Sequence, residues 1–179
     1  LHPRADEFDL SRVYEYEDFL SADECEAIIE HGRGIVKESM VVCASNENCK
    51  SEARTSRNGF INDADHPVAR AISERVERLL GIDTRHFEDL QVVHYTPGQE
   101  YKGHYDACSD DADLSKCDST VPVAGQRYAT FLIYLNDDFE GGETCFPRRT
   151  ASSGSGGAGP TATEVDCGKP EVLKIRPKR

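Results

Sequence analysis

Residues 91–106 read QVVHYTPGQEYKGHYD, and this stretch decides the fold of the 179-residue chain. Residues 90–95 are apolar and aromatic, which predicts a β-strand, and residues 96–99 (TPGQ) predict the turn that closes it. His104 and Asp106 follow, and two side chains spaced in this way on a strand project from one face. Such a pair occurs by chance in many chains, but an imidazole and a carboxylate on one face can hold a metal ion.

A second strand signal lies downstream of this pair. Residues 127–135 (RYATFLIYL) are the most strand-like stretch of the sequence, and residues 141–144 (GGET) predict a turn after it. A strand, a turn, the pair, a buried strand and a glycine turn, in that order, predict the mouth of an antiparallel barrel.

Three segments in this order and spacing resemble prolyl 4-hydroxylases of the plant and algal type: residues 91–106, 125–135 (GQRYATFLIYL) and 140–147 (EGGETCFP). The resemblance extends from a helix near Ser21 to the C-terminus. It implies an α+β fold with a double-stranded β-helix (jelly-roll) core and supporting N-terminal helices. It also implies an enzyme that uses Fe(II), 2-oxoglutarate, O2 and ascorbate to convert proline in proline-rich or collagen-like peptides to 4-hydroxyproline.

The resemblance also implies a role for each of seven side chains. It assigns metal binding to His104 and Asp106, 2-oxoglutarate binding to Tyr95 and Thr130, and peptide binding to Arg54, Tyr101 and Arg127. A proline-rich peptide already has the polyproline II shape, and aromatic and guanidinium surfaces suit its rings and carbonyls. Each of four residues also has a purely structural alternative. Tyr95 would be a buried aromatic residue of a strand, Thr130 would be a β-forming residue, and the two arginines would form surface salt bridges.

Two further groups that the family uses have no counterpart in this sequence. Non-haem Fe(II) oxygenases hold iron with two histidines and one carboxylate. In the family the distal histidine, and the lysine that binds the far carboxylate of 2-oxoglutarate, lie beyond a strand that resembles residues 172–177, and this sequence ends at Arg179. We therefore expect the C-terminal strands to come from a longer form of the chain or from a second chain. His94 is an alternative third ligand, although an ordinary strand histidine is favoured.

Two other functions are compatible with the same predicted peptide-binding groove. One is a non-catalytic module that binds proline-rich peptides and has lost its metal centre. The other is a related dioxygenase that modifies a different residue, because the groove and not the oxidant selects the substrate.

Composition places outer bounds on function. The chain has 33 acidic and 21 basic residues, a net charge of -12, and a pI near 4.9. This charge argues against a nucleic-acid or anionic-membrane surface and favours a neutral or basic peptide, although it also serves solubility. No apolar run reaches membrane-spanning length, and because the first residue is Leu1 we expect a mature product whose targeting segment has been removed.

Seven cysteines in one small domain favour an oxidising compartment. We expect the lumen of the endoplasmic reticulum or Golgi, or secretion. The spacing suggests three bridges, Cys43 to Cys49, Cys108 to Cys117, and Cys145 to Cys167. Cys25 lies within a helical pattern and is predicted to be a buried free thiol.

Local signals predict the remaining elements of one domain over residues 1–179. A capping box at residues 21–24 (SADE) begins one helix, and Pro67 and Gly81 bound a second, both expected to support the barrel. Strands are predicted at residues 35–42 and 171–176. Loops are predicted at residues 44–52, at 107–125, and at 151–163, which is rich in Gly and Ser and is expected to be flexible.

Overall fold

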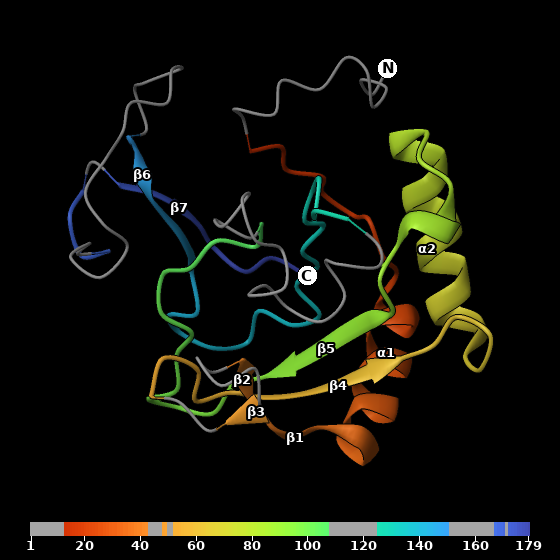
Figure 1. Ribbon diagram of the computed structural model, residues 1–179, viewed down its shortest axis with the longest axis horizontal. Coiled ribbons are helices and arrows are strands. Elements are labelled where there is room, and N and C mark those ends of the chain that lie inside the picture. Colours follow the sequence, from red (N-terminus) through yellow and green to blue (C-terminus); the bar gives the residue numbers. More distant parts are fainter. Residues whose placement is uncertain (1–12, 43–47, 50–51, 108–124, 151–166, 171) are drawn as a thin grey trace.

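In the computed structural model, two α-helices pack against a three-stranded antiparallel sheet (Figure 1). The structure describes residues 13–42, 48–49, 52–107, 125–150, 167–170 and 172–179. The predicted loop at 151–163, most of the loop at 107–125, and the cysteines at positions 43, 108 and 117 lie outside these residues. The described part is therefore a mixed structure of helices and strands.

Helix α1 spans Ala22–Ile35 and begins at the predicted capping box. Glu24 N donates to Ser21 Oγ at 3.2 Å, and Ser21 N donates to Glu24 Oε2 at 2.8 Å. The predicted strand at 35–42 is only partly right. Because Val36 N still bonds Gly32 O at 3.0 Å, the helical pattern includes residue 35. The extended backbone is confined to β1 (Lys37–Glu38) and β2 (Val41–Val42).

Helix α2 spans Pro67–Leu80 and confirms both predicted boundaries. Pro67 occupies the first turn, where its missing N–H costs no hydrogen bond. Gly81 ends the helix with a φ of 69°, in the left-handed region that glycine adopts without a steric penalty. A short 3-10 helix, η2 (Thr84–His86), leads towards the next strand.

The sheet has the order β1-β4-β5, with β4 at Arg57–Ile61 and β5 at Leu90–His94. The prediction of β5 is confirmed, and so is the turn after it, where Gln99 N donates to Thr96 O at 3.0 Å. Strand β4 was not predicted. Its sequence, RNGFI, has a glycine at its centre and no alternating pattern, and it is held by its antiparallel pairing with β5.

The core lies between the two helices and this sheet. Its buried members are apolar residues from α1, α2, β4 and β5: Ile28, Ile61, Ala69, Ile72, Val76 and Val92. Helix α1 approaches the sheet closely at Gly32, where an added Cβ would lie 2.9 Å from Val92 Cγ1. Cys25 is 1 % exposed and free, as predicted. Both helices thus pack against this sheet, and their predicted role as scaffold for a barrel stays a prediction.

A second antiparallel pair joins β6 (Thr144–Thr150) to β7 (Val172–Ile175). Strand β7 confirms the prediction at 171–176, and positive φ values at Gly141 and Gly142, 82° and 73°, confirm the turn before β6. The structure pairs Cys145 with Cys167, whose Cα atoms lie 6.1 Å apart, within the range of disulfides.

The strand predicted at residues 127–135 is wrong as a paired element, because these residues belong to no strand in the part of the chain described here. Some of their side chains nevertheless reach the core. Phe131, Ile133 and Leu135 pack against the core, whereas Leu132 is 57 % exposed. β-forming residues therefore do not suffice for a paired strand, because pairing also needs a neighbouring backbone.

Two smaller features complete the description. Strand β3 (Asn48–Cys49) pairs with β2 inside the segment predicted to be a loop, so that loop is shorter than expected. Within the described residues, no helix is both long enough and apolar enough to cross a membrane.

Candidate functional site

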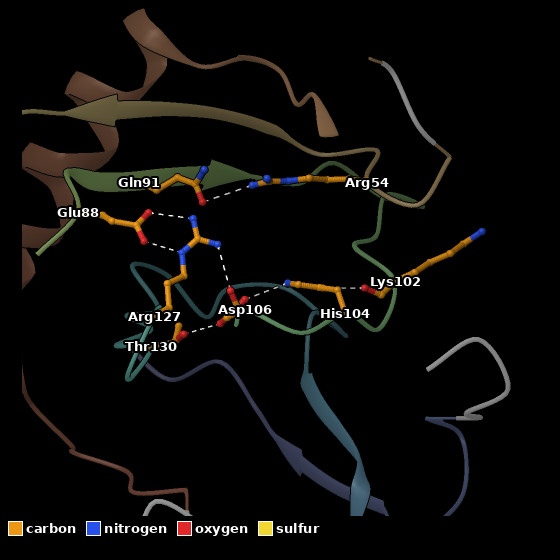
Figure 2. Close-up of polar contacts among 8 residues, drawn as sticks. All are labelled: Arg54, Glu88, Gln91, Lys102, His104, Asp106, Arg127 and Thr130. Carbon is orange, nitrogen blue, oxygen red and sulfur yellow. Dashed lines mark hydrogen bonds and ion pairs between the residues drawn. The ribbon is translucent and has the colours of Figure 1, made fainter. Parts of the chain in front are cut away.

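The candidate site is built where two loops are joined by backbone hydrogen bonds. After the turn at 96–99 the chain runs beside residues 53–55, with Thr55 N bonding Glu100 O at 3.0 Å and Lys102 N bonding Ala53 O at 2.8 Å. Arg54 and Tyr101 face each other in an isolated antiparallel bridge. This bridge brings residues 101–106 below the end of β5 (Figure 2).

His104 and Asp106 converge, although not for the predicted reason. His104 Nε2 lies 3.2 Å from Asp106 Oδ1, and the side chains are 40 % and 43 % exposed. The expectation that a strand projects both from one face is wrong, since residues 104–106 form no strand and the chain bends at Asp106. The backbone pairing with residues 53–55 extends only to Lys102, and a bend then turns the carboxylate back towards the imidazole.

The orientation of the His104 ring is set by a backbone carbonyl. Its Nδ1 lies 2.9 Å from Lys102 O, and because a carbonyl can only accept, Nδ1 carries the hydrogen. Nε2 then faces a carboxylate, an arrangement that requires either a proton or a cation between the two groups. A metal ion satisfies both groups at once, and a metal-binding histidine commonly donates its other N–H to a carbonyl in this way.

The ionisation of the two groups agrees with this arrangement. The hydrogen bond that protonated His104 donates to Asp106 raises the pKa of His104 above its usual 6.5, against the opposing effect of partial burial. The hydrogen bond from His104 lowers the pKa of Asp106 to about 2, with a smaller contribution from the Thr130 hydroxyl. Thr130 Oγ1 donates to Asp106 Oδ2. The carboxylate is therefore anionic over the physiological range, as a metal ligand must be.

Arg127 connects the site to the segment that precedes β5. Its Nε and Nη2 donate to the two carboxylate oxygens of Glu88, the latter at 3.0 Å, and its Nη1 lies 3.4 Å from the backbone oxygen of Asp106 (Figure 2). The predicted alternative of a salt bridge is thus observed for this arginine. The guanidinium of Arg127 therefore connects the loop that carries His104 and Asp106 to the segment before β5.

Arg54, Tyr101 and His104 form a stack. The guanidinium carbon of Arg54 lies 4.6 Å from the Tyr101 ring centroid, and Tyr101 stacks on His104 at 3.7 Å between centroids with an angle of 17°. Arg54 Nη2 is also 3.4 Å from Gln91 Oε1 on β5. Arg54 is therefore held by an aromatic ring and a side-chain amide.

Tyr95 lies beside this stack, at the residue after β5. Ser56, Arg54 and Tyr101 lie close enough to influence the ionisation of its hydroxyl. Partial burial raises its pKa above 10.0. The predicted alternative of a buried strand aromatic is wrong, since the residue is 47 % exposed.

The structure thus gathers the predicted residues unequally. His104, Asp106, Thr130 and Arg127 are connected by direct contacts, and Arg54 and Tyr101 join them through the His104 stack. Tyr95 and Thr130, predicted to share one cosubstrate, contact different neighbours. The roles in metal, 2-oxoglutarate and peptide binding remain predictions.

Three contributors were not predicted. They are Glu88, Gln91 and the backbone oxygen of Lys102. Glu88 is one of 33 acidic residues and lies 39 residues from Arg127, so no local pattern marks it. A backbone carbonyl leaves no trace in residue type, and it is found only when the chain path is known.

The donor set fits part of an iron site. One imidazole nitrogen and one carboxylate oxygen are two of the three ligands of a two-histidine, one-carboxylate site. Among the described residues, no group of three His, Cys, Asp or Glu side chains could hold a metal ion. His94 is therefore not brought into a three-residue cluster with the pair.

A cavity of about 330 Å³ lies elsewhere, beside the turn before β6. It is lined by Phe139, Glu140, Gly141, Glu143, Arg176 and Pro177. None of the predicted site residues lines it, so this cavity is separate from His104 and Asp106.

Comparison with known proteins agrees with the site. Residues 90–178, which contain the pair and Arg127, match the 2OG-Fe(II) oxygenase superfamily. In Arabidopsis thaliana, the protein named "Probable prolyl 4-hydroxylase 3" is 34 % identical over 169 residues, covering 93 % of this chain and 55 % of that protein. Prolyl 4-hydroxylase 5 of the same plant is 36 % identical over 170 residues, covering 94 % and 55 %.

A third plant relative, prolyl 4-hydroxylase 1, is 37 % identical over 139 residues, covering 76 % of this chain and 47 % of that protein. The chain spans about half the length of the curated relatives it matches. The similarity includes the helices as well as the site, since two of these matches cover more than nine tenths of the chain. The chain belongs to the 2OG-Fe(II) oxygenase superfamily, and it is similar to these plant proteins named prolyl 4-hydroxylases.

Proposed function

We propose that this protein hydroxylates peptidyl proline to 4-hydroxyproline, using Fe(II), 2-oxoglutarate and O2. The observation that carries the proposal is the convergence of His104 Nε2 and Asp106 Oδ1 to 3.2 Å, with the imidazole oriented by Lys102 O. The names of the relatives supply the substrate class. Proline-rich and collagen-like peptides are the proposed substrates.

The proposed architecture is a double-stranded β-helix to which residues 1–179 contribute one catalytic domain. Two features support it, namely the separate antiparallel β1-β4-β5 and β6-β7 sheets and the packing of Phe131, Ile133 and Leu135 against the core. The third iron ligand would come from outside the described residues, from a further segment or a second chain. The lysine expected for 2-oxoglutarate would come from the same source.

The chain's own residues would bind, orient and shield the reactants. Bound Fe(II), together with 2-oxoglutarate and O2, would supply the oxidising chemistry that places one oxygen atom on the proline ring. His104 and Asp106 would hold the ion, and the Lys102 carbonyl would keep Nε2 of the histidine directed at it. Tyr95 and Thr130 would hydrogen-bond 2-oxoglutarate through their hydroxyls.

Peptide binding would use the surface around the stack. Tyr101 offers a ring edge to proline, and Arg54 and Arg127 offer donors to peptide carbonyls, which are unpaired in a polyproline II chain. Arg127 binds Glu88 through Nε and Nη2, and its Nη1 lies 3.4 Å from the backbone oxygen of Asp106, beside the proposed metal ligand. We assign that nitrogen to the substrate.

The proposed location is the secretory lumen, and ascorbate is proposed as the reductant. The pairing of Cys145 with Cys167 supports an oxidising compartment. Non-reducing peptide mapping of the purified protein is expected to recover these two cysteines in one linked peptide. Recovery of both as free thiols would argue against the lumen.

One experiment tests the function directly. The complete native protein, with the further segment or second chain proposed to supply the third iron ligand, is incubated with Fe(II), 2-oxoglutarate, ascorbate and, separately, a proline-rich, a collagen-like or a lysine-containing peptide without proline. A mass gain of one oxygen on proline, with matching succinate, is expected for the first two peptides and is lost in Asp106→Ala. Tight peptide binding without turnover would support the non-catalytic module, and oxygen on lysine would support a related dioxygenase.

A further inference from the structure

One arrangement in the site is not explained by peptide binding. Tyr101 covers a face of the imidazole of His104, with ring centroids 3.7 Å apart and planes inclined by 17°. Its other neighbour is the guanidinium of Arg54, at 4.6 Å from the ring centroid. The Tyr101 ring is thus placed between a cation and a metal-binding imidazole.

The backbone holds this stack in place. Arg54 and Tyr101 form an antiparallel bridge. On either side of it, Thr55 N donates to Glu100 O at 3.0 Å and Lys102 N donates to Ala53 O at 2.8 Å. The Nε atom of Arg54 is buried and has no hydrogen-bond partner among the described residues. Because this buried donor is unpaired, the cation–π contact with the Tyr101 ring contributes to holding the Arg54 guanidinium in place.

An electron-rich ring next to an imidazole acts on metal binding in two ways. It restricts rotation of the imidazole about its Cβ bond, so that Nε2 is directed before the ion arrives. It also stabilises the imidazole more strongly once a cation withdraws electron density from it, because the ring face carries negative quadrupole charge. Both effects favour the metal-loaded state over the metal-free state.

We infer that Tyr101 is a positioning residue for the metal ligand His104, and that Arg54 acts by holding the Tyr101 ring. This inference rests on the proposed metal site. It gives both residues a role that operates before any peptide binds. A tyrosine that only contacts substrate would leave metal affinity unchanged.

The test is a titration of the complete native protein, with the further segment or second chain that supplies the third ligand, with Mn(II) alone, a divalent ion of similar ligand preference that does not oxidise in air. Free Mn(II) is followed by electron paramagnetic resonance in the absence of peptide and 2-oxoglutarate. Tyr101→Leu, which removes the ring, is expected to weaken Mn(II) binding by about 3- to 10-fold, the worth of one aromatic contact. Tyr101→Phe keeps the ring and is expected to retain the affinity.

The matched control is Tyr128→Leu, which removes an equal ring from a tyrosine that is 61 % exposed. Its Mn(II) affinity is expected to equal that of the unsubstituted protein. Thermal unfolding of each metal-free variant shows that it is folded. If Tyr101→Leu fails to fold, pentafluorophenylalanine at position 101 replaces it, since this side chain keeps the shape of Phe and reverses the charge of the ring face.

The outcomes separate this inference from the proposed function. Absence of Mn(II) binding by the unsubstituted protein would overturn the metal site and this inference with it. Equal affinity in folded Tyr101→Leu and the unsubstituted protein would overturn the positioning role alone. With the fluorinated side chain, weaker binding than Tyr101→Phe supports the role, and equal binding overturns it.

Discussion

Thr130 shows how one side chain can serve two partners. Its hydroxyl donates to Asp106 Oδ2, whereas the family resemblance assigns it to 2-oxoglutarate. A hydroxyl has one hydrogen and two lone pairs, so donating to the carboxylate leaves it able to accept from another group. The two roles differ in what is lost when the hydroxyl is removed.

Thr130→Val is expected to weaken metal binding by about 10-fold, as loss of an outer partner of a metal-binding carboxylate commonly does. Thr130→Ser keeps the hydroxyl and should restore most of the affinity. The measurement is Mn(II) titration followed by the KM for 2-oxoglutarate. A raised KM with unchanged metal affinity would assign the hydroxyl to the cosubstrate alone.

Among the elements, helix α1 is fitted to the sheet at one glycine. An added Cβ at Gly32 would lie 2.9 Å from Val92 Cγ1, whereas at Gly34 nothing lies within 4 Å. Val92 is 8 % exposed and β-branched, so its side chain has few alternative rotamers. The two glycines of one helix therefore predict substitutions of opposite sign.

Gly32→Ala is expected to destabilise the protein by about 1–3 kcal/mol through overpacking. Gly34→Ala should be neutral or stabilising by up to about 1 kcal/mol, because alanine is the better helix former. Chemical denaturation of both variants measures the difference. The double variant Gly32→Ala/Val92→Ala should lose less stability than the sum of the losses in the two single variants, because the smaller side chain at 92 makes room for the added methyl group. A loss equal to that sum would show that the contact is not the cause.

The two helices are also joined by charge. Arg75 donates to Glu24 at 2.6 Å and to Phe19 O, and the side chains of the pair are 34 % and 22 % exposed. The hydrogen bond from Arg75 is the main cause that lowers the pKa of Glu24 below 4.5. Since the folded-state pKa is lowered, this pair adds stability above pH 4.5 and loses it as the pH falls through the folded-state value.

Arg75→Met, which keeps the aliphatic stem, is expected to cost roughly 1–2 kcal/mol at neutral pH. The difference from the unsubstituted protein should shrink as the pH falls through the folded-state pKa of Glu24. Arg78→Met on the same helix is the control, since its pair with Glu74 is 4.0 Å apart and mostly exposed. Denaturation curves at several pH values measure both, and a pH-independent difference would assign the loss to packing.

At the scale of the whole molecule, the charge of -12 acts on every approaching peptide. A negative field concentrates cationic ligands and repels acidic ones, and salt screens it over about 8 Å at physiological ionic strength. The field adds to local contacts but does not replace them. Its contribution is therefore measurable as a dependence on salt.

We expect a proline-rich peptide with flanking lysines to have a lower KM than the same peptide with flanking glutamates. The ratio of the two KM values should approach one as salt is raised, because salt screens the long-range electrostatic interaction that distinguishes the two peptides. A ratio that does not change with salt would mean that local contacts choose between them.

The parts of the fold that could be predicted from the sequence are those specified locally. Pro67 and Gly81 fix α2 through their own backbone preferences, and the capping box fixes the start of α1. Residues 127–135 are predicted as a strand from their β-forming side chains, but pairing depends on a distant backbone. Strand β4 escaped prediction for the converse reason, since its partner specifies it more than its own residues do.

The candidate site follows the same division. His104 and Asp106 were recognised from their spacing and from the family resemblance, and the structure brings them together by a bend that the spacing did not predict. Glu88 and Gln91 act across 39 and 37 residues, on Arg127 and Arg54, and no local pattern announces them. Long-range partners of a site require the folded chain.

Lys102 takes part in the site through its main chain alone. Its N–H bonds Ala53 O and its carbonyl bonds His104, while its side chain points away from the imidazole (Figure 2). Natural variation at this position should therefore look unconstrained, with almost any side chain tolerated. Proline is the exception, since it has no N–H to give. A position that accepts nearly every residue except proline would show that its backbone takes part in the site. A search for invariant residues would overlook such a position.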